Sequence, residues 1–303
     1  MSLRLASAPV TWGVWERTIE GSDLIPPERM LETVAALGYT GIELGPPGYF
    51  GTDGASVGEA LGSHGLELVG GFAPLHLADE AAYREDISLW LDPVIDMLDA
   101  TGARGPVVLA DAETDERIAV AGRPDELART ALDADAFARA LERVNEAVTR
   151  CRARGVDAVF HHHTATYVES EDELERFLAG TDVGICFDTG HALVGGIDPV
   201  QGVRLCGSRI AHLHLKDVDG ALLARVQSGE LGMEEAWGDG IFCPFGEGAV
   251  DFAAVLAAPE LAGFSGWSVL EQDRVAVRAA DLESVRAVEE RNLAVVVAAQ
   301  PSA

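Results

Sequence analysis

The sequence predicts a single-domain α/β protein with the (β/α)₈, or TIM-barrel, fold over residues 1–303. Eight short apolar runs alternate with helical segments, which is typical of a parallel sheet buried on both faces. Polar residues stand at or just past the carboxyl ends of these runs, where barrel active sites are built. The 303 residues contain no low-complexity linker, which favours one barrel over two domains. A doubly wound open sheet is the alternative, but no GxGxxG motif follows the first strand.

The first half of the chain contributes four strands, each an apolar run bounded by glycine, proline or polar residues. The first helix has Pro26-Pro27 at its opening turn and Gly38 at its end, and the second, weaker helix ends at Gly65. In chain order the predicted segments are strand 5–12, helix 26–38, strand 40–44, helix 56–64, strand 66–72, helix 80–101, strand 106–109 and an acidic loop at 111–116.

The second half opens with the most regular helix of the chain. Phe137, Leu141 and Val144 keep a helical spacing, Asp133 or Asp135 can cap the start, and Gly155 stands at the end. In chain order the predicted segments are helix 133–151, strand 156–160, helix 171–178, strand 183–187, helix 198–205, strand 210–215, an irregular excursion at 218–248 between the seventh and eighth strands, helix 250–256, strand 267–271 and helix 281–297.

Composition excludes several classes of protein. The 22 basic and 50 acidic residues give a net charge of −28, which repels nucleic acid and anionic membrane surfaces. No apolar run is long enough to span a membrane and no secretory signal is recognised, so we expect a cytoplasmic protein. The four cysteines are widely spaced and lack a CxxC motif, so we expect reduced thiols.

Four metal-competent residues follow the fifth to eighth strands in turn. Adjacent barrel strands lie roughly 4.8 Å apart, so side chains at these four ends can reach one ion. Two imidazoles and two carboxylates favour Mn²⁺, Co²⁺, Fe²⁺ or Zn²⁺ over Ca²⁺, and we expect Mn²⁺ or Co²⁺ first. The alternation along strand 156–160 leaves His163 as an alternative to His161. The predicted ligands are His161, Asp188, His214 and Glu271.

Other polar and aromatic residues crowd the same rim. Trp12 and Trp15 can form an apolar wall for a sugar-like ring or pack in the core, and Asp217 can orient a neighbour or cap a loop. Lys216 follows His214 on the same strand face, and a dry pocket beside a metal would lower the pKa of this lysine. The residues predicted to bind substrate are Trp12, Glu43, His76, His163, Asp217, Arg225 and Phe242. The excursion 218–248 would either close over the site or form a subunit contact.

Five stretches carry a resemblance to a known family. They are Gly41-Ile42-Glu43-Leu44, Phe187-Asp188-Thr189-Gly190-His191, His212-Leu213-His214-Leu215-Lys216-Asp217, Phe242-Cys243-Pro244-Phe245-Gly246-Glu247-Gly248 and Glu271-Gln272-Asp273, together with the histidine cluster after the fifth strand. The chain resembles the xylose-isomerase-like sugar isomerase/epimerase barrels and, within them, the inosose (2-keto-myo-inositol) dehydratases of inositol catabolism.

The resemblance implies metal ligands at Asp188, His214 and Glu271. A glutamate of most relatives aligns with His161, which argues against a ketose epimerase, because such enzymes use paired glutamates. It also implies dehydration of a cyclitol ketone by carbonyl polarisation, removal of the α-proton and loss of the β-hydroxyl, with Lys216, His191 and Glu271 as the candidate proton-transfer residues. A metal-dependent ketose isomerase or epimerase and a non-catalytic sugar-binding barrel remain the alternatives. The expected partner is a small polyol or cyclitol ketone, and a homo-oligomer is left open.

Overall fold

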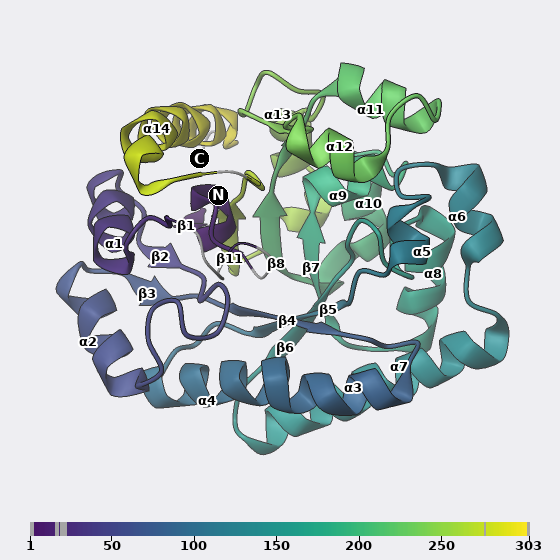
Figure 1. Ribbon diagram of the computed structural model, residues 1–303, viewed down its shortest axis with the longest axis horizontal. Helices are drawn as coiled ribbons and strands as arrows, with labels where there is room; N and C mark the ends of the chain where they lie inside the picture. Colours follow the sequence, from purple (N-terminus) through teal and green to yellow (C-terminus); the bar gives the residue numbers. More distant parts are fainter. Residues whose placement is uncertain (1–2, 16–17, 19–22, 276, 302–303) are drawn as a thin grey trace.

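The core of the computed structural model, which describes residues 3–15, 18, 23–275 and 277–301, is one parallel sheet curled into a barrel (Figure 1). Its nine strands lie in the order β3-β2-β1-β11-β8-β7-β6-β5-β4. The strands are β1 Arg4–Ser7, β2 Gly41–Ile42, β3 Glu67–Leu68, β4 Gly71–Leu75, β5 Val107–Asp111, β6 Ala158–His161, β7 Gly184–Asp188, β8 Ile210–Leu215 and β11 Trp267–Leu270.

The sheet closes at its third strand, which is broken into β3 and β4. β3 pairs with β2 and β4 pairs with β5. Between them the Leu44 amide donates to the Gly70 carbonyl at 2.9 Å and the Gly71 amide to the Pro106 carbonyl at 3.2 Å. The chain at Gly105 passes so close that a Cβ there would lie 2.0 Å from the Val69 carbonyl, which requires glycine. The two halves count as one barrel strand, so the predicted (β/α)₈ TIM barrel is confirmed.

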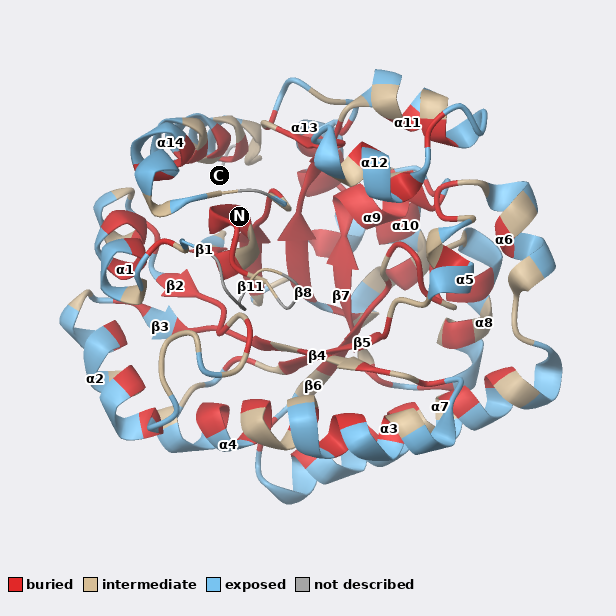
Figure 2. Ribbon diagram, viewed as in Figure 1, coloured by how far each residue is buried: buried red, intermediate tan, exposed pale blue. Residues whose placement is uncertain are grey.

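Helices surround the barrel with their apolar faces turned inward, as the red inner and pale blue outer faces in Figure 2 show. The sheet is therefore buried on both sides, which accounts for its almost unbroken apolar runs. The α-helices are α1 Pro27–Ala36, α2 Gly54–Ser63, α3 Glu80–Asp86, α4 Asp92–Thr101, α5 Asp115–Ile118, α6 Pro124–Thr130, α7 Ala134–Ala153, α8 Glu171–Gly180, α9 Thr189–Val194, α10 Pro199–Cys206, α11 Gly220–Gln227, α12 Met233–Gly238, α13 Phe252–Leu256 and α14 Leu282–Ala299.

Helix α7 shows how the local sequence sets an element's bounds. The Asp133 side chain caps the start by accepting a hydrogen bond of 2.8 Å from the Ala136 amide. Phe137 and Val144 are buried against the barrel. Gly155, with φ +73°, ends the segment in a conformation that other residues rarely adopt. The predicted helix is confirmed, and Asp133 is the cap.

Four predicted segments differ from the structure. The first strand ends at Ser7, because Pro9–Trp12 forms a 3₁₀ turn. The predicted helix at 80–101 is interrupted by one π-helical turn, Ile87–Leu91, between α3 and α4. The acidic loop and the segment after the sixth strand contain the short helices α5 and α9, which the sequence pattern did not predict.

The excursion at 218–248 was predicted to be irregular, and this is wrong. It contains α11, α12 and an antiparallel pair of short strands, β9 Asp217–Val218 and β10 Phe242–Cys243. Apolar residues of this segment, among them Val226, Met233 and Ile241, form a small core of their own. Among the described residues, no helix combines the length and apolar character needed to cross a membrane.

Candidate active site

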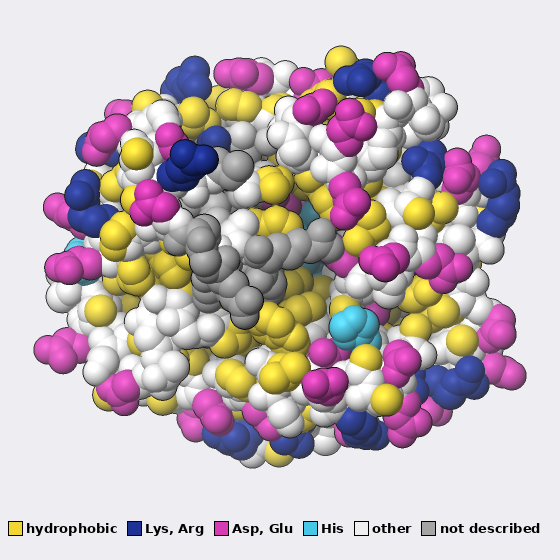
Figure 3. Space-filling view, in the orientation of Figure 1, with side chains coloured by type: hydrophobic (Ala, Val, Ile, Leu, Met, Phe, Trp, Pro, Cys, Tyr) yellow, Lys and Arg dark blue, Asp and Glu magenta, His cyan; other side chains and the backbone are white. Residues whose placement is uncertain are grey.

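A pocket of about 300 Å³ opens at the carboxyl end of the barrel strands. Its inner wall carries Glu43, His161, His214, Lys216 and Glu271. The remaining lining is largely apolar and aromatic and includes Trp15, Phe72, Trp90 and Trp237. Figure 3 shows hydrophobic side chains gathered near the middle of this face, with acidic side chains spread around the periphery. The pocket therefore offers one polar wall and broad apolar surface, which suits a small ring.

Three of the four predicted metal ligands lie together, with His214 and Glu271 on the polar wall and Asp188 next to them. One ligand atom from each of Asp188, His214 and Glu271 lies within 4.8 Å of the others. His214 Nδ1 is 3.1 Å from Glu271 Oε2 and 3.8 Å from Asp188 Oδ2. All three residues are buried. Asp188 Oδ2 and His214 Nδ1 have no hydrogen-bond partner among the described residues. Their remaining contacts are with charged side chains, Glu271 for His214 Nδ1 and Lys216 for Asp188 Oδ2, and a buried carboxylate oxygen and imidazole nitrogen without hydrogen bonds are suited to bind a cation.

Local structure fixes which atom of each ligand faces the group. The Asp188 side chain caps α9, with Oδ1 accepting hydrogen bonds from the Gly190 and His191 amides at 2.7 and 2.8 Å. This leaves Oδ2 to face His214. The other nitrogen of His214, Nε2, lies 3.2 Å from Glu43 Oε1. A carboxylate behind an imidazole fixes its tautomer and orientation, so Glu43 presents Nδ1 of His214 to the group.

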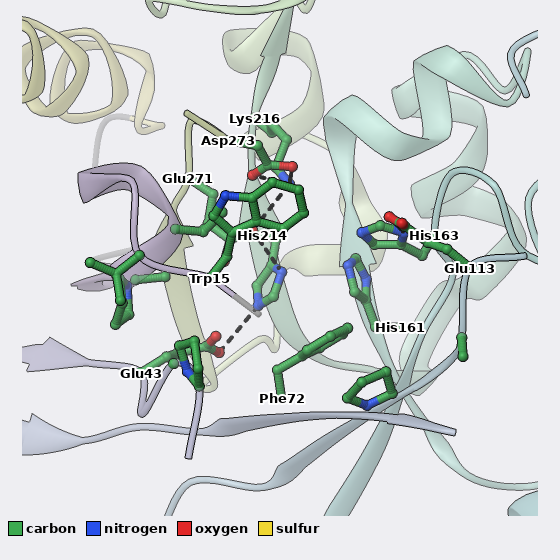
Figure 4. A pocket seen from close by; sticks show the side chains of 18 of the residues that line it. Trp15, Glu43, Phe72, Glu113, His161, His163, His214, Lys216, Glu271 and Asp273 are labelled. Carbon is green, nitrogen blue, oxygen red and sulfur yellow. Dashed lines mark hydrogen bonds and ion pairs between the residues drawn. The ribbon is translucent and has the colours of Figure 1, made fainter. Parts of the chain in front are cut away.

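Lys216 joins the metal-ligand group to Asp273 (Figure 4). Its Nζ lies 2.8 Å from Asp273 Oδ1, 3.2 Å from Glu271 Oε2 and 3.4 Å from Asp188 Oδ2. Burial opposes the charged form of Lys216, but the Asp188, Asp273 and Glu271 carboxylates outweigh it and raise the pKa of this lysine. These carboxylates act against the lowering that was expected for a lysine in a dry pocket beside a metal, and the expectation for the metal-bound site stays a prediction.

His161, the fourth predicted ligand, lies beside the group of three. Its ring centre is 4.9 Å from that of His214, and its Nδ1 is buried without a hydrogen-bond partner among the described residues. Its ring nitrogens come within 4.8 Å of ligand atoms of Cys186 and His214, and also of His163 and His191. Both His161 and His163 line the pocket, so the structure leaves either as a fourth ligand. Burial lowers the pKa of His161, which favours the neutral imidazole that metals bind.

His191 lies behind the pocket wall rather than on it. It belongs to α9 instead of the predicted loop. Its Nε2 is 3.0 Å from Lys216 Nζ and its Nδ1 is 2.8 Å from Thr164 Oγ1. It is 1% exposed, so its contact with the pocket runs through Lys216.

Three of the residues predicted to bind substrate line the pocket: Glu43, His76 and His163. Glu43 Oε1 also lies 2.9 Å from His212 Nε2, so this carboxylate serves two histidines. His163 Nδ1 lies 2.8 Å from the Thr164 carbonyl, which leaves its other nitrogen available. His76 is held by Asp86, whose Oδ2 is 2.8 Å from His76 Nδ1.

The other four lie elsewhere among the described residues. Trp12 is 0% exposed and donates from Nε1 to Ser7 Oγ at 3.0 Å, so it packs in the core. Arg225 is on α11 and pairs with Glu230 at 2.9 Å.

Asp217 and Phe242 support the site from behind. The Asp217 carboxylate accepts hydrogen bonds from four backbone amides of its own loop and of 246–250. Phe242 is 1% exposed, and Lys216 Nζ lies 4.8 Å from the centre of its ring. Neither lines the pocket, because the Asp217 carboxylate binds backbone amides and Phe242 packs against Lys216.

Other pocket residues lie at positions that no sequence pattern singled out. Asp111 and Glu113 lie in the predicted acidic loop, Trp90 in the middle of a predicted helix, and Phe72 at the end of a predicted strand. Asp86, which holds His76, lies inside the predicted helix 80–101 and had no distinguishing spacing.

Comparison with known proteins identifies a family and relatives that share this fold. Residues 31–290 match the family model described as "Xylose isomerase-like TIM barrel". The chain is 32% identical to the rhizopine catabolism protein MocC of Rhizobium meliloti, covering 90% of this chain and 82% of the relative. It is 29% identical to an inosose dehydratase of Geobacillus kaustophilus, covering 89% and 87% respectively.

Solved structures share the fold at low sequence identity. An L-ribulose 3-epimerase superposes with a TM-score of 0.69 at 15% identity, covering 98% of this chain and 94% of that one. A probable 3-DHS dehydratase from Bacillus anthracis gives a TM-score of 0.67 at 13% identity, covering 96% and 99%. These likenesses concern the fold alone.

Proposed function

The chain belongs to the xylose isomerase-like TIM-barrel family, and from this premise we propose that it is a divalent-metal-dependent hydro-lyase acting on a cyclic polyhydroxy ketone, 2-keto-myo-inositol (inosose). The single observation that carries the proposal is the buried group of Asp188, His214 and Glu271 beside Lys216, of which His214, Glu271 and Lys216 line the pocket. Relatives named inosose dehydratase, aligned over about nine tenths of the chain, support the reaction class.

The side chains fit a divalent ion. We propose that Asp188, His214 and Glu271 hold it, with His161 or His163 as a fourth ligand. The mixture of imidazole and carboxylate favours Mn²⁺ or Co²⁺, with Zn²⁺ and Fe²⁺ as alternatives. When bound, such an ion supplies Lewis acidity toward a ketone oxygen in the pocket.

The charge of the lining favours an uncharged substrate. Carboxylates outnumber the cationic side chains around the cavity even when a divalent ion is counted, so a phosphate or carboxylate on the substrate would be repelled. The lining carboxylates are Glu43, Asp111, Glu113, Glu271 and Asp273, and the lining cations are Lys216 and Arg274. Inosose carries hydroxyl groups and a ketone and no charge, which matches this pocket.

The chain's own residues divide the remaining work. Lys216 Nζ faces the pocket and is held by Asp273, so we assign it to donate the proton that converts the departing β-hydroxyl to water. His191 positions Lys216 from behind through the contact of 3.0 Å, and Thr164 in turn fixes the ring of His191. The aromatic side chains Trp15 and Phe72 cover apolar surface against which the C–H face of a cyclitol ring can pack.

Incubation of the purified protein with Mn²⁺ or Co²⁺ and inosose tests the proposal. We expect ultraviolet absorbance of an enone to appear, and chelation to abolish it. Ketose isomers formed without enone would instead support the isomerase or epimerase. Inosose binding that survives both chelation and Lys216→Ala, with no turnover of either substrate, would support a sugar-binding barrel.

A further inference from the structure

A histidine–carboxylate pair stands at the pocket rim, outside the proposed metal group. His76 follows β4 directly and lines the pocket. Asp86, the last residue of α3, is buried, and its Oδ2 accepts hydrogen bonds from the His76 backbone amide at 2.7 Å and from His76 Nδ1 at 2.8 Å. The carboxylate assigns the proton to Nδ1, which leaves the lone pair of Nε2 as the available base.

The topology puts this pair opposite Lys216. Counting around the barrel from β4, the strands β5, β6 and β7 come before β8, which carries Lys216 beyond its end. Because β3 and β4 form one strand of eight, four steps is half the circumference. Both side chains line the same cavity of about 300 Å³. A ring bound between them would have Lys216 on one side and His76 on the other.

Elimination of water moves two protons at two different atoms, so it needs groups at separate places on the ring. The side chains so far assigned to metal binding or proton transfer come from β6, β7, β8 and the segments that follow β6 and β11. On the β4 side of the pocket, Phe72 has been given apolar packing only, and no side chain there has been given a proton to move. A buried carboxylate that orients an imidazole toward a cavity is the arrangement used to make histidine a general base.

We propose that His76, oriented by Asp86, is the base that removes the α-proton; this rests on the proposed dehydration. The C–H bond α to the ketone breaks, its proton passes to His76 Nε2, and its electron pair moves onto the ketone oxygen as an enolate. The enolate then reforms the carbonyl while the Cβ–O bond breaks, and the hydroxyl takes a proton from the opposite wall and leaves as water. The substrate is thereby converted to enone and water. His76 then gives up its proton to solvent, and Lys216 takes one from solvent.

The test compares His76→Gln and His76→Ala with His64→Gln as a matched control. His64 is half-buried at the end of α2, its Nδ1 lies 2.9 Å from the Ala60 carbonyl, and it does not line this cavity. General-base catalysis contributes roughly 10²- to 10⁴-fold, so we expect both His76 variants to lose about that much kcat with little change in KM. The control should keep the wild-type kcat, and bound metal and melting temperature should be unchanged in all three proteins.

Chemical rescue separates proton transfer from a structural role. Added imidazole should restore enone formation to His76→Ala, and 4-methylimidazole should restore more because it is more basic. A kcat of His76→Gln equal to that of the wild type, or rescue that ignores basicity, would overturn the assignment while leaving the dehydratase intact. Wild-type protein that forms no enone would overturn the proposed function and the base together.

Discussion

Asp217 was predicted to bind substrate, but in the structure it holds a loop behind the site, and a substitution there can distinguish the two roles. The side chain is 0% exposed. Oδ1 accepts hydrogen bonds from the Val218 and Val250 amides at 2.9 and 3.0 Å, and Oδ2 accepts from the Gly246 and Gly248 amides at 2.8 and 3.1 Å. One carboxylate therefore holds the loop that returns to the barrel from the excursion.

Asp217→Asn should destabilise the fold without touching the metal. The amide keeps one acceptor oxygen and turns an NH₂ group toward the other two backbone donors, so two backbone N–H groups, at least partly buried, lose their acceptor. At roughly 1–3 kcal/mol each, the free energy of unfolding should fall by about 2–6 kcal/mol. For a chain of this size that is a drop in melting temperature of roughly 4–12 °C, measured by scanning calorimetry.

Asp219→Asn is the matched control. Asp219 makes the same kind of bonds to the Ala221 and Leu222 amides, but it caps α11 at the exposed surface. Asparagine caps a helix about as well as aspartate, so this variant should melt within about 1 °C of the wild type. If Asp217→Asn also melts there, or loses inosose affinity with its melting temperature intact, the structural role assigned to Asp217 is refuted.

Two further predictions concern residues away from the metal group. Burial raises the pKa of Glu289 from 4.5 to about 7, against the opposing effect of Arg274. A carboxyl that holds its proton more tightly when folded loses stability as pH rises, so wild-type stability should fall between pH 4.5 and about 7, by an amount on the order of 3 kcal/mol. Glu289→Gln should flatten this part of the pH–stability profile in denaturant titrations, and an unchanged slope would contradict the assignment. Arg225→Ala should leave the KM for inosose within about twofold of wild type, because the guanidinium pairs with Glu230 on α11, and a much larger KM in steady-state assays would return Arg225 to the pocket.

The barrel could be predicted because its parallel sheet is buried on both faces, which makes each strand a short apolar run between helical segments. The apolar runs ending before Asp188 and the alternation through His214 placed both side chains at strand ends, where the structure brings them together with Glu271. The same reasoning limited the cap of α7 to Asp133 or Asp135, and the structure selects Asp133. A single sequence therefore shows two things: the apolar repeat of each helix or strand, and the polar residues at strand ends that the barrel brings together.

What sequence could not give depends on contacts between distant segments. Nothing local distinguishes Asp86, which acts on His76 from inside a helix, and nothing local predicts that Asp217 turns inward to a loop some thirty residues away. The pKa of Lys216 is raised by Asp188 at the end of β7 and by Glu271 and Asp273 after β11, and no local pattern around Lys216 shows that these acids surround it. The helices α11 and α12 are short and pack on each other, so their apolar residues gave no long periodic stretch.

The central claim is that Asp188, His214 and Glu271 hold one divalent ion at the mouth of the barrel. Calorimetric titration of metal-stripped protein with Mn²⁺ tests it most directly, comparing wild type with Asp188→Asn and with Asp219→Asn as control. We predict about one ion per chain in the wild type and the control, and binding weakened by at least ~10-fold in Asp188→Asn. Wild-type protein that binds no ion, or Asp188→Asn protein that binds it as tightly as the wild type, would contradict the account.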